Sequence, residues 1–422
     1  MGQILSSAWA LFLGLMLLMV GNGLQGTLLG VRGEIEGFST FQMSVVMSAY
    51  FAGFLGGSRM APEMIRRVGH VRVFAALASL ISAVLILYPA LAHPVAWALG
   101  RVVIGFCFSG VYVTAESWIN NAADNENRGK ALSLYMIVQM TGIVSAQGLL
   151  LVADPSGYVL FVIPSVLVSI SFAPILLSIS PTPAFDTAKP LAIKELLELS
   201  PLGCMGMFLL GGVFAAQFGM AAVYGGEVGL TLPQISLFVA SFYLGALLLQ
   251  YPLGWISDRM DRRVLIMLVA AGAGVGACVA MVFGMRFEIL LASAFVIGGT
   301  SNPLYSLLVA YTNDFLEPDD MAAASGGLVF INGVGAIMGP LITGWVMQVS
   351  GPQGYFLIIA VLMLALAAYA AYRMTQRPPV AAEDTTAYTP VMASATPVAL
   401  EVALEYAIDS ANEEEDAQNE SN

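Results

Sequence analysis

Twelve apolar runs, each long enough to cross a lipid bilayer, divide this chain of 422 residues. They lie at about residues 8–30, 41–61, 72–92, 95–119, 131–152, 158–179, 202–226, 232–256, 264–285, 288–312, 322–348 and 354–374. A transmembrane helix needs ~20 predominantly apolar residues, and only helices or closed barrels satisfy their backbone polar groups in lipid. The runs therefore predict an all-α membrane protein with twelve transmembrane helices, joined by loops too short to hold a folded soluble domain.

Charged residues are scarce and are concentrated near one end of the chain. Apolar residues make up 58% of the sequence and charged residues 10%, whereas a soluble domain carries about 25% charged residues. Residues 376–422 contain ten acids and one base and so carry most of the formal net charge of −12. We interpret this segment as a disordered acidic tail. We expect no nucleic-acid partner, because no basic patch occurs.

The positions of Lys and Arg predict the orientation of the chain. Short cytoplasmic loops accumulate these residues, and a cytoplasmic N-terminus places thirteen of the sixteen on the cytoplasmic side. Only Arg32 and Arg286 then face outside, and Arg101 lies within the fourth span. We therefore expect both termini in the cytoplasm, which agrees with an even number of spans.

The second half of the chain repeats the sequence pattern of the first half. A chain of regular segments should be tested for such an internal repeat before other features are interpreted. An offset of 192 or 193 residues relates the pairs Gly14/Gly206, Gln25/Gln217, Gln42/Gln234, Gly53/Gly245, Arg67/Arg259, Tyr112/Tyr305, Asn120/Asn313 and Gly142/Gly335. Chance could pair glycines in this composition, but Gln, Tyr and Arg are scarce here. The repeat predicts two duplicated six-helix halves at residues 1–180 and 201–375, a cytoplasmic linker at 181–200 and the tail at 376–422.

Three short motifs resemble signatures of the major facilitator superfamily. The loop after the eighth span reads Gly254-x-x-x-Asp258-Arg259-x-Asp261-Arg262-Arg263, with Asp261 where Gly is usual. The equivalent loop after the second span keeps Arg67 and Gly69 but has Arg66 where an acid is expected. Span four supplies Arg101-x-x-x-Gly105. The stretch from Glu116 to Met136 further resembles a YcaD-like bacterial branch of that superfamily.

This resemblance implies a fold and a mode of action. In the superfamily, two parallel six-helix halves rock around a site near the middle of the membrane, and helices 1, 4, 7 and 10 line that site. The resemblance implies a secondary active transporter in the bacterial cytoplasmic (inner) membrane. Its expected partners are the lipid bilayer, a small-molecule substrate and, as a coupling ion, a proton or another cation. We expect a monomer that is not an enzyme.

One face of the fourth span carries several polar and aromatic side chains. Arg101, Gly105, Phe108, Tyr112 and Glu116 share this face at helical spacing. Arg101 either faces a cavity, where it would position a substrate anion or a proton relay, or snorkels to the outer interface. For Glu116, which lies ~22 Å along the helix from Arg101, we favour a structural role.

That structural role would be an ion pair at the inner rim, with Arg67 or Arg128 as the partner. Related positions in the loops and span ends are candidate gate residues, because their charges could pair across the rim. The full set is Arg66, Arg67, Gly69, Glu116, Arg128, Gly254, Asp258, Arg259 and Asp314.

Amide side chains within apolar spans form a second group of candidates. Lipid would leave them without hydrogen-bond partners, so they must face protein or water. They either contact substrate or join helices as interhelical hydrogen bonds. The substrate-binding candidates are Gln25, Arg101, Tyr112, Gln139, Gln217, Asn302, Tyr305 and Asn332. Amide and phenol groups without an obvious carboxylate favour a small polar organic solute over a bulky cationic drug.

Other classes of function have less support from the sequence. A receptor or scaffold on the same fold would bind ligand without moving it. A membrane enzyme would need a nucleophile beside a base, or a metal-ligand cluster, and the spacing of residues suggests neither. We expect no cofactor and no metal, because His70 and His93 have no neighbouring ligand residues in the sequence.

Overall fold

The computed structural model describes residues 2–122, 125–177, 193–316, 318–378, 385, 388–392, 396–400 and 402–404. Side chains are described in the same ranges, apart from those of residues 2–8, 120–130, 318, 319 and 322. The expected linker at 181–200 therefore falls mostly outside the described residues. Its last part forms α8 (Ile193–Leu199), directly before the second half.

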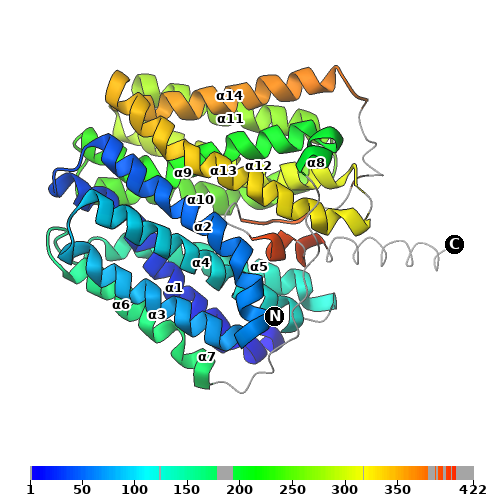
Figure 1. Ribbon diagram of the computed structural model, residues 1–422. Coiled ribbons are helices and arrows are strands. Elements are labelled where there is room, and N and C mark those ends of the chain that lie inside the picture. The colour runs from blue at the N-terminus through cyan, green and yellow to red at the C-terminus, as the bar shows by residue number, and fades with distance from the viewer. Residues whose placement is uncertain are drawn as a thin grey trace.

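Among the described residues, twelve long helices lie where the apolar runs predict them, six in each half (Figure 1). The first six are α1 (Gly2–Ile35), α2 (Thr40–Val68), α3 (His70–Ala90), α4 (Pro94–Ala122), α5 (Asn125–Leu149) and α6 (Val159–Ser171), which α7 (Ala173–Leu177) continues after a break at Phe172. The second six are α9 (Pro201–Glu227), α10 (Leu232–Ser257), α11 (Arg262–Phe283), α12 (Phe287–Asn313), α13 (Pro318–Ser350) and α14 (Gly354–Met374). The predicted all-α fold of two six-helix halves is confirmed.

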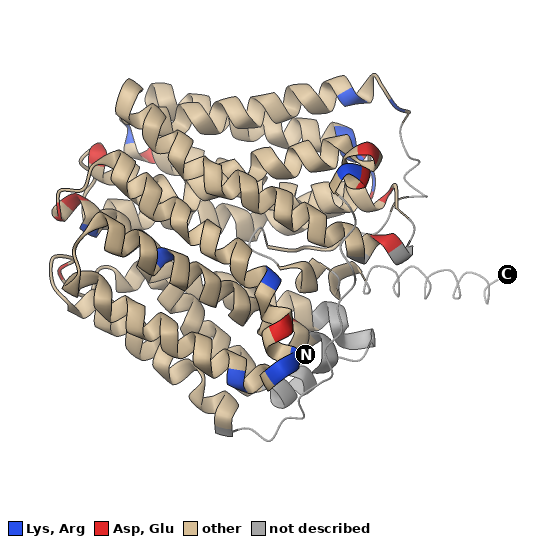
Figure 2. Ribbon diagram, viewed as in Figure 1, with Lys and Arg blue, Asp and Glu red and all other residues tan. Residues whose placement is uncertain are grey.

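Eleven of the long helices, judged over the described residues, are each long and apolar enough to cross a membrane. The remaining one, α2, is less apolar because small and polar residues make its contacts with other helices. Ser48 donates a hydrogen bond to the carbonyl of Ile337 in α13 at 2.6 Å, and Gly53 lies against α4. Charged residues gather at the two ends of the helices, as Figure 2 shows.

Turn chemistry at equivalent positions explains part of the sequence repeat. Ser39 and Thr231 cap the N-termini of α2 and α10, and each forms a capping box with the Gln three residues later. Gly37 and Gly229, which precede these caps, both have a φ of 73°, a conformation that favours glycine. The duplication therefore preserves the entry into the second helix of each half.

Close helix crossings are also repeated in the two halves. A Cβ atom built on Gly105 of α4 would lie 1.9 Å from the carbonyl oxygen of Tyr50 in α2, and one on Gly53 would lie 1.9 Å from that of Val102. In the second half, a Cβ atom built on Gly245 of α10 would lie 2.0 Å from the carbonyl oxygen of Phe295, and one on Gly298 of α12 would lie 2.1 Å from that of Phe242. These glycines let the paired backbones touch.

The two halves contact each other at the end of the molecule opposite to α8. There Gly30 of α1 packs on Ala222 of α9, and Ser236 of α10 donates a hydrogen bond to the carbonyl of Gln147 in α5 at 2.6 Å. We call this the closed end. The other end, where α8, Gly69 and the loop at 258–261 lie, is the linker end.

Part of the chain after residue 376 is packed, contrary to the expectation of a disordered tail. Residues 397–400 and 402–404 are helical, and the described residues Val391, Thr396, Leu400 and Val402 are buried. Figure 1 shows this segment lying between the two halves. The apolar residues 397–400 and 402–404 pack between the halves. The net charge of the whole tail gave no indication that this short apolar stretch would be buried.

The glycine crossing of α2 and α4 gives a test of the packing. Gly105→Ala should lower the free energy of unfolding by ~1–3 kcal/mol, because its methyl group would overlap the Tyr50 carbonyl. The measurement is the midpoint of thermal unfolding in detergent. As a matched control, Gly148→Ala in α5, where no heavy atom lies within 4 Å of the new Cβ, should leave the midpoint unchanged or raise it. Equal midpoints for both variants would contradict the crossing.

Candidate functional site

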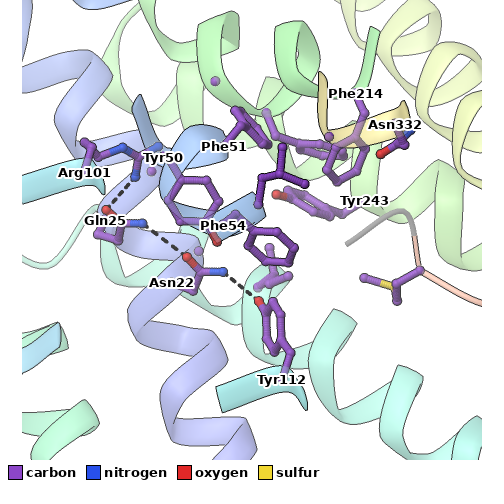
Figure 3. Close-up of a pocket in the computed structure, with 18 of the residues that line it drawn as sticks. Asn22, Gln25, Tyr50, Phe51, Phe54, Arg101, Tyr112, Phe214, Tyr243 and Asn332 are labelled. Atoms are coloured by element: carbon purple, nitrogen blue, oxygen red, sulfur yellow. Dashed lines mark hydrogen bonds between the residues drawn. The ribbon is translucent and has the colours of Figure 1, made fainter. Parts of the chain in front are cut away.

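A cavity of about 120 Å³ lies between the two halves (Figure 3). Residues from α1, α2, α4, α5, α9, α10, α12 and α13 line it, and Met392 of the tail segment joins them. Of the predicted substrate-binding residues, the lining includes Gln25, Arg101, Tyr112, Asn302 and Asn332. The sequence candidates therefore converge on one site for the most part.

A chain of hydrogen bonds runs along one wall of the cavity. Arg101 donates from Nη1 to Oε1 of Gln25 at 2.8 Å, Gln25 donates to Asn22 at 3.2 Å, and Asn22 donates to the hydroxyl of Tyr112 at 2.9 Å. Figure 3 shows these four side chains in sequence. The chain follows α4 over the eleven residues from Arg101 to Tyr112, or ~16 Å.

Arg101 is a buried cation with an incomplete set of partners. The residue is only 4% exposed, so it does not snorkel to an interface. Its guanidinium carbon lies 4.6 Å from the centre of the Tyr50 ring, a cation–π contact. Its Nη2 faces the sulfur of Met47 at 3.5 Å, and its Nε has no hydrogen-bond partner. Among the described residues, no acid pairs with it.

Aromatic side chains line another part of the cavity wall. Phe51 and Phe54 of α2, Phe214 and Phe218 of α9, and Tyr243 of α10 all line the cavity. Sequence reasoning missed them, because an aromatic residue in an apolar helix gives no signal of its own. The pairs at spacing four, Tyr50/Phe54 and Phe214/Phe218, would have indicated a shared face.

Three predicted substrate-binding residues lie outside the cavity lining. Gln217 exchanges hydrogen bonds with Ser301 at 3.0 and 3.1 Å and is fully buried. Tyr305 is 1% exposed and Gln139 is 2% exposed, and neither lines the cavity. In this conformation the cavity lining thus includes Gln25 and Tyr112 but not their repeat equivalents Gln217 and Tyr305. Contact of Gln217 and Tyr305 with substrate stays a prediction.

One candidate gate residue of the second half, Asp314, belongs to a buried ion pair at the linker end. Arg262 of α11 pairs with Asp314 at the end of α12, and both side chains are 2% exposed. Asp258 lies 3.5 Å from Arg262, so the loop signature joins three helices. Gly254 packs under the ring of Tyr388, and Arg259 stacks on Trp255.

The neighbouring Asp261 begins α11 and accepts a hydrogen bond from the backbone N–H of Arg263. Burial raises the pKa of its carboxyl, but hydrogen bonds from Arg263 outweigh burial, and the net pKa lies below the usual value. An acid at the position where Gly is usual thus serves as a helix cap.

Arg66 and Arg67, the first-half equivalents of Asp258 and Arg259, lie on the surface. Arg66 and Arg67 both bind Glu63 within α2, with side chains that are 57% and 74% exposed. Gly69 has a φ of 86° and separates α2 from α3. Neither Arg67 nor Arg259 pairs with the other half in the described residues. Pairing across the rim in another conformation stays a prediction.

Glu116 has different partners from those expected. It is 2% exposed and accepts hydrogen bonds from the Tyr135 hydroxyl at 2.9 Å and from the Thr396 hydroxyl. The backbone groups of Thr396 and Ala399 also bond to its carboxylate. Arg67, one suggested partner, is engaged with Glu63 instead, and the side chain of Arg128 lies outside the described residues.

The contrast between the two loops gives a stability test. Asp314→Ala should lower the free energy of unfolding by ~3–5 kcal/mol, because it removes the buried carboxylate that pairs with Arg262 and leaves only the more exposed Asp258, at 3.5 Å, beside that cation. Glu63→Ala removes the exposed pairs in the first half and should cost about 1 kcal/mol or less. Thermal unfolding of both variants in detergent measures the difference, and similar losses would contradict a buried pair.

The chain also matches known proteins over most of its length. A family model described as Major Facilitator Superfamily matches residues 11–226 and 202–403. An uncharacterized MFS-type transporter, YcaD of Escherichia fergusonii, is 27% identical over 356 residues, which cover 82% of this chain and 90% of that protein. YcaD of Salmonella arizonae is 25% identical over 83% of this chain and 91% of its own.

Solved structures share the fold at low sequence identity. A mutant form of the nucleoside transporter NupG superposes with a TM-score of 0.75 at 15% identity and covers 86% of this chain and 98% of that chain. A bacterial homolog of the human lysosomal transporter Spinster, in an inward-facing and unoccupied conformation, gives 0.65 at 15% identity, with 97% of each chain covered.

Proposed function

This chain belongs to the Major Facilitator Superfamily, and we propose that it moves a small polar organic solute across the bacterial cytoplasmic membrane by alternating access. The observation that carries the proposal is the hydrogen-bonded chain from Arg101 through Gln25 and Asn22 to Tyr112, which lines the cavity between the halves. Each of these groups can replace its hydrogen bond to a neighbouring side chain with a hydrogen bond to a solute. Amide, phenol and guanidinium groups recognise polar solutes by hydrogen bonding.

The contacts between the halves support a rocking mechanism. Packing of Gly30 on Ala222 and the bond from Ser236 to Gln147 hold the closed end together. Loss of these contacts, with new contacts at the linker end, would expose the cavity to the other side. A solute favours that exchange only if it binds the two states with different affinities.

We further propose that the linker end faces the cytoplasm, with both termini on that side, as the distribution of Lys and Arg favours. The conformation described above is then inward-facing. A proton or another cation as coupling ion is consistent with secondary transport, in which the solute moves with or against an ion gradient.

Binding and flux can be tested with a matched pair of variants. A thermal-shift screen against a metabolite library identifies solutes that stabilise the folded protein, and radiolabelled hits are then followed into proteoliposomes. Gln25→Ala should weaken binding of the hit about tenfold or more, because a solute bond and the link to Arg101 are both lost. Gln217→Ala, which breaks the Ser301 pair outside the cavity, should lower stability but leave affinity unchanged.

The outcomes separate the alternatives. Binding of a solute without accumulation in proteoliposomes would indicate a receptor or scaffold instead of a transporter. Equal loss of affinity in the Gln25 and Gln217 variants would contradict the assignment of the site to this cavity.

A further inference from the structure

The cavity contains a cation that the described residues leave without an acid. A charged side chain within a membrane span costs ~2.5–3.5 kcal/mol on insertion scales, and a guanidinium offers five N–H donors. Of these, Arg101 directs Nη1 to Gln25 and Nη2 to a sulfur, which is a weak acceptor, while Nε has no partner. Gln25 and Tyr50, which contact the guanidinium, carry no negative charge. The positive charge of Arg101 is therefore not neutralised by these neighbours.

The rest of the cavity is suited to a flat apolar group. Comparison of the two halves shows how the polarity is distributed: Asn22 of α1 corresponds to Phe214 of α9 at the offset of 192, and Arg101 corresponds to Ala294 at 193. Polar groups therefore come mainly from the first half. The rings of Phe214 and Phe218, 4.4 Å apart, face the cavity from the second.

The cavity volume limits the size of that apolar group. An engineered protein cavity of ~150 Å³ binds benzene, and this cavity measures about 120 Å³. The space is therefore of the order that one ring occupies.

We propose that the cavity binds a single-ring organic anion, with its carboxylate at Arg101 and its ring against the aromatic side chains of α2 and α9. Movement of the anion across the membrane rests on the proposed function. Binding of the anion does not, because it can be measured separately. A carboxylate accepts two N–H bonds from a guanidinium and neutralises the buried charge. Rings pack edge-to-face or offset on Phe and Tyr.

The test compares three probes of nearly equal shape: benzoate, benzamide and benzylamine. Isothermal titration of the purified full chain in detergent should give an affinity for benzoate at least tenfold above that for benzamide, and no heat with benzylamine. Arg101→Gln should abolish this preference, and Arg101→Lys should keep part of it. The control is Arg59→Gln, because Arg59 also stacks on an aromatic ring at 4.6 Å but lies exposed on α2, outside the cavity lining.

Equal affinities for benzoate and benzamide, or no binding of benzoate at 10 mM, would overturn the anion proposal. If a neutral solute is transported while benzoate does not bind, transport stands and the anion class fails. If benzoate binds through Arg101 but does not accumulate in proteoliposomes, the anion class stands and the transport proposal fails.

An independent observation concerns the tail segment, defined as the described residues 388–392, 396–400 and 402–404. On the second half, the Tyr388 hydroxyl accepts a hydrogen bond from Gln250 at 2.9 Å, and its backbone N–H donates to Asp258 at 3.0 Å. The backbone of Val391 both donates to and accepts from the Ser306 hydroxyl, at 2.9 and 3.1 Å. The segment is thus fixed to α10 and α12.

The same segment is also bound to the first half. The Thr396 hydroxyl donates to Glu116 of α4, and Met392 packs between Met140 of α5 and Ala246 of α10. Met392 also lines the central cavity. The tail segment therefore bridges the halves at the end where they must approach each other in the alternate state.

We also infer that the tail segment is an autoinhibitory strap that closes the linker-end mouth of the cavity and holds the protein in the conformation described. While it lies between α4, α5, α10 and α12, the linker end cannot close by contact between the halves. Its release opens the path to the cavity and permits the alternate state.

The strap can be tested without a known solute. With the three native cysteines replaced by alanine, Met140→Cys reports access to the mouth, because Met140 is 3% exposed beneath Met392. Its reaction with a membrane-impermeant thiosulfonate in inside-out vesicles should be slow in the full chain. It should be at least tenfold faster when the chain ends at Pro378. Lys194→Cys, whose parent side chain is 90% exposed, should react at one rate in both.

A second variant keeps the whole tail. Thr396→Glu places a carboxylate against Glu116, and repulsion should release the strap and raise the Met140→Cys rate as truncation does. Thr375→Glu, on an exposed residue outside the strap, should not change the rate. Equal Met140→Cys rates in the full chain, the truncated chain and the Thr396→Glu variant would overturn the strap.

Discussion

The absence of water in the hydrocarbon core constrains every polar group of this protein. Backbone groups are satisfied within helices, and polar side chains must meet protein or a cavity. This constraint collects Asn22, Gln25, Arg101 and Tyr112 on one wall, since each satisfies the next. The arrangement of the helices around that wall follows, because α2 and α4 approach closely only where glycine allows backbone contact.

The two halves share a fold but differ in chemistry. Equivalent capping boxes and glycine crossings persist in both. By contrast, the cavity cation occurs only in the first half of the described chain, and the buried Arg262–Asp314 pair only in the second. Duplication thus supplies a symmetric frame in which both halves provide apolar lining, while the first half provides most of the polar lining. A solute with one charged and one apolar end suits such a cavity.

Helix positions could be predicted closely, because an apolar run of sufficient length has one stable form in lipid. Five of the eight substrate-binding candidates line the cavity. A polar side chain in a span must find a hydrogen-bond partner in protein or in a cavity, because lipid offers none. Gln217 and Tyr305 lie outside this lining, although the repeat pairs them with Gln25 and Tyr112. Ser301 satisfies Gln217 within its own half, and a pairing of this kind depends on side-chain positions that an offset in the sequence does not fix. The aromatic wall was missed because Phe214 or Tyr243 resembles any other apolar residue of a span.

The sequence by itself determined the number of spans, their duplication and the family, because hydrophobic length and motif spacing are local properties of the chain. The tertiary structure alone decided which partners satisfy the buried polar groups. Glu116 bonds to Tyr135 and Thr396, while Arg67, one arginine suggested for it, pairs with Glu63, and part of an acidic tail is buried between the halves. The Glu116–Thr396 bond joins residues 280 positions apart. It forms only once the packed halves create a surface that neither segment has alone.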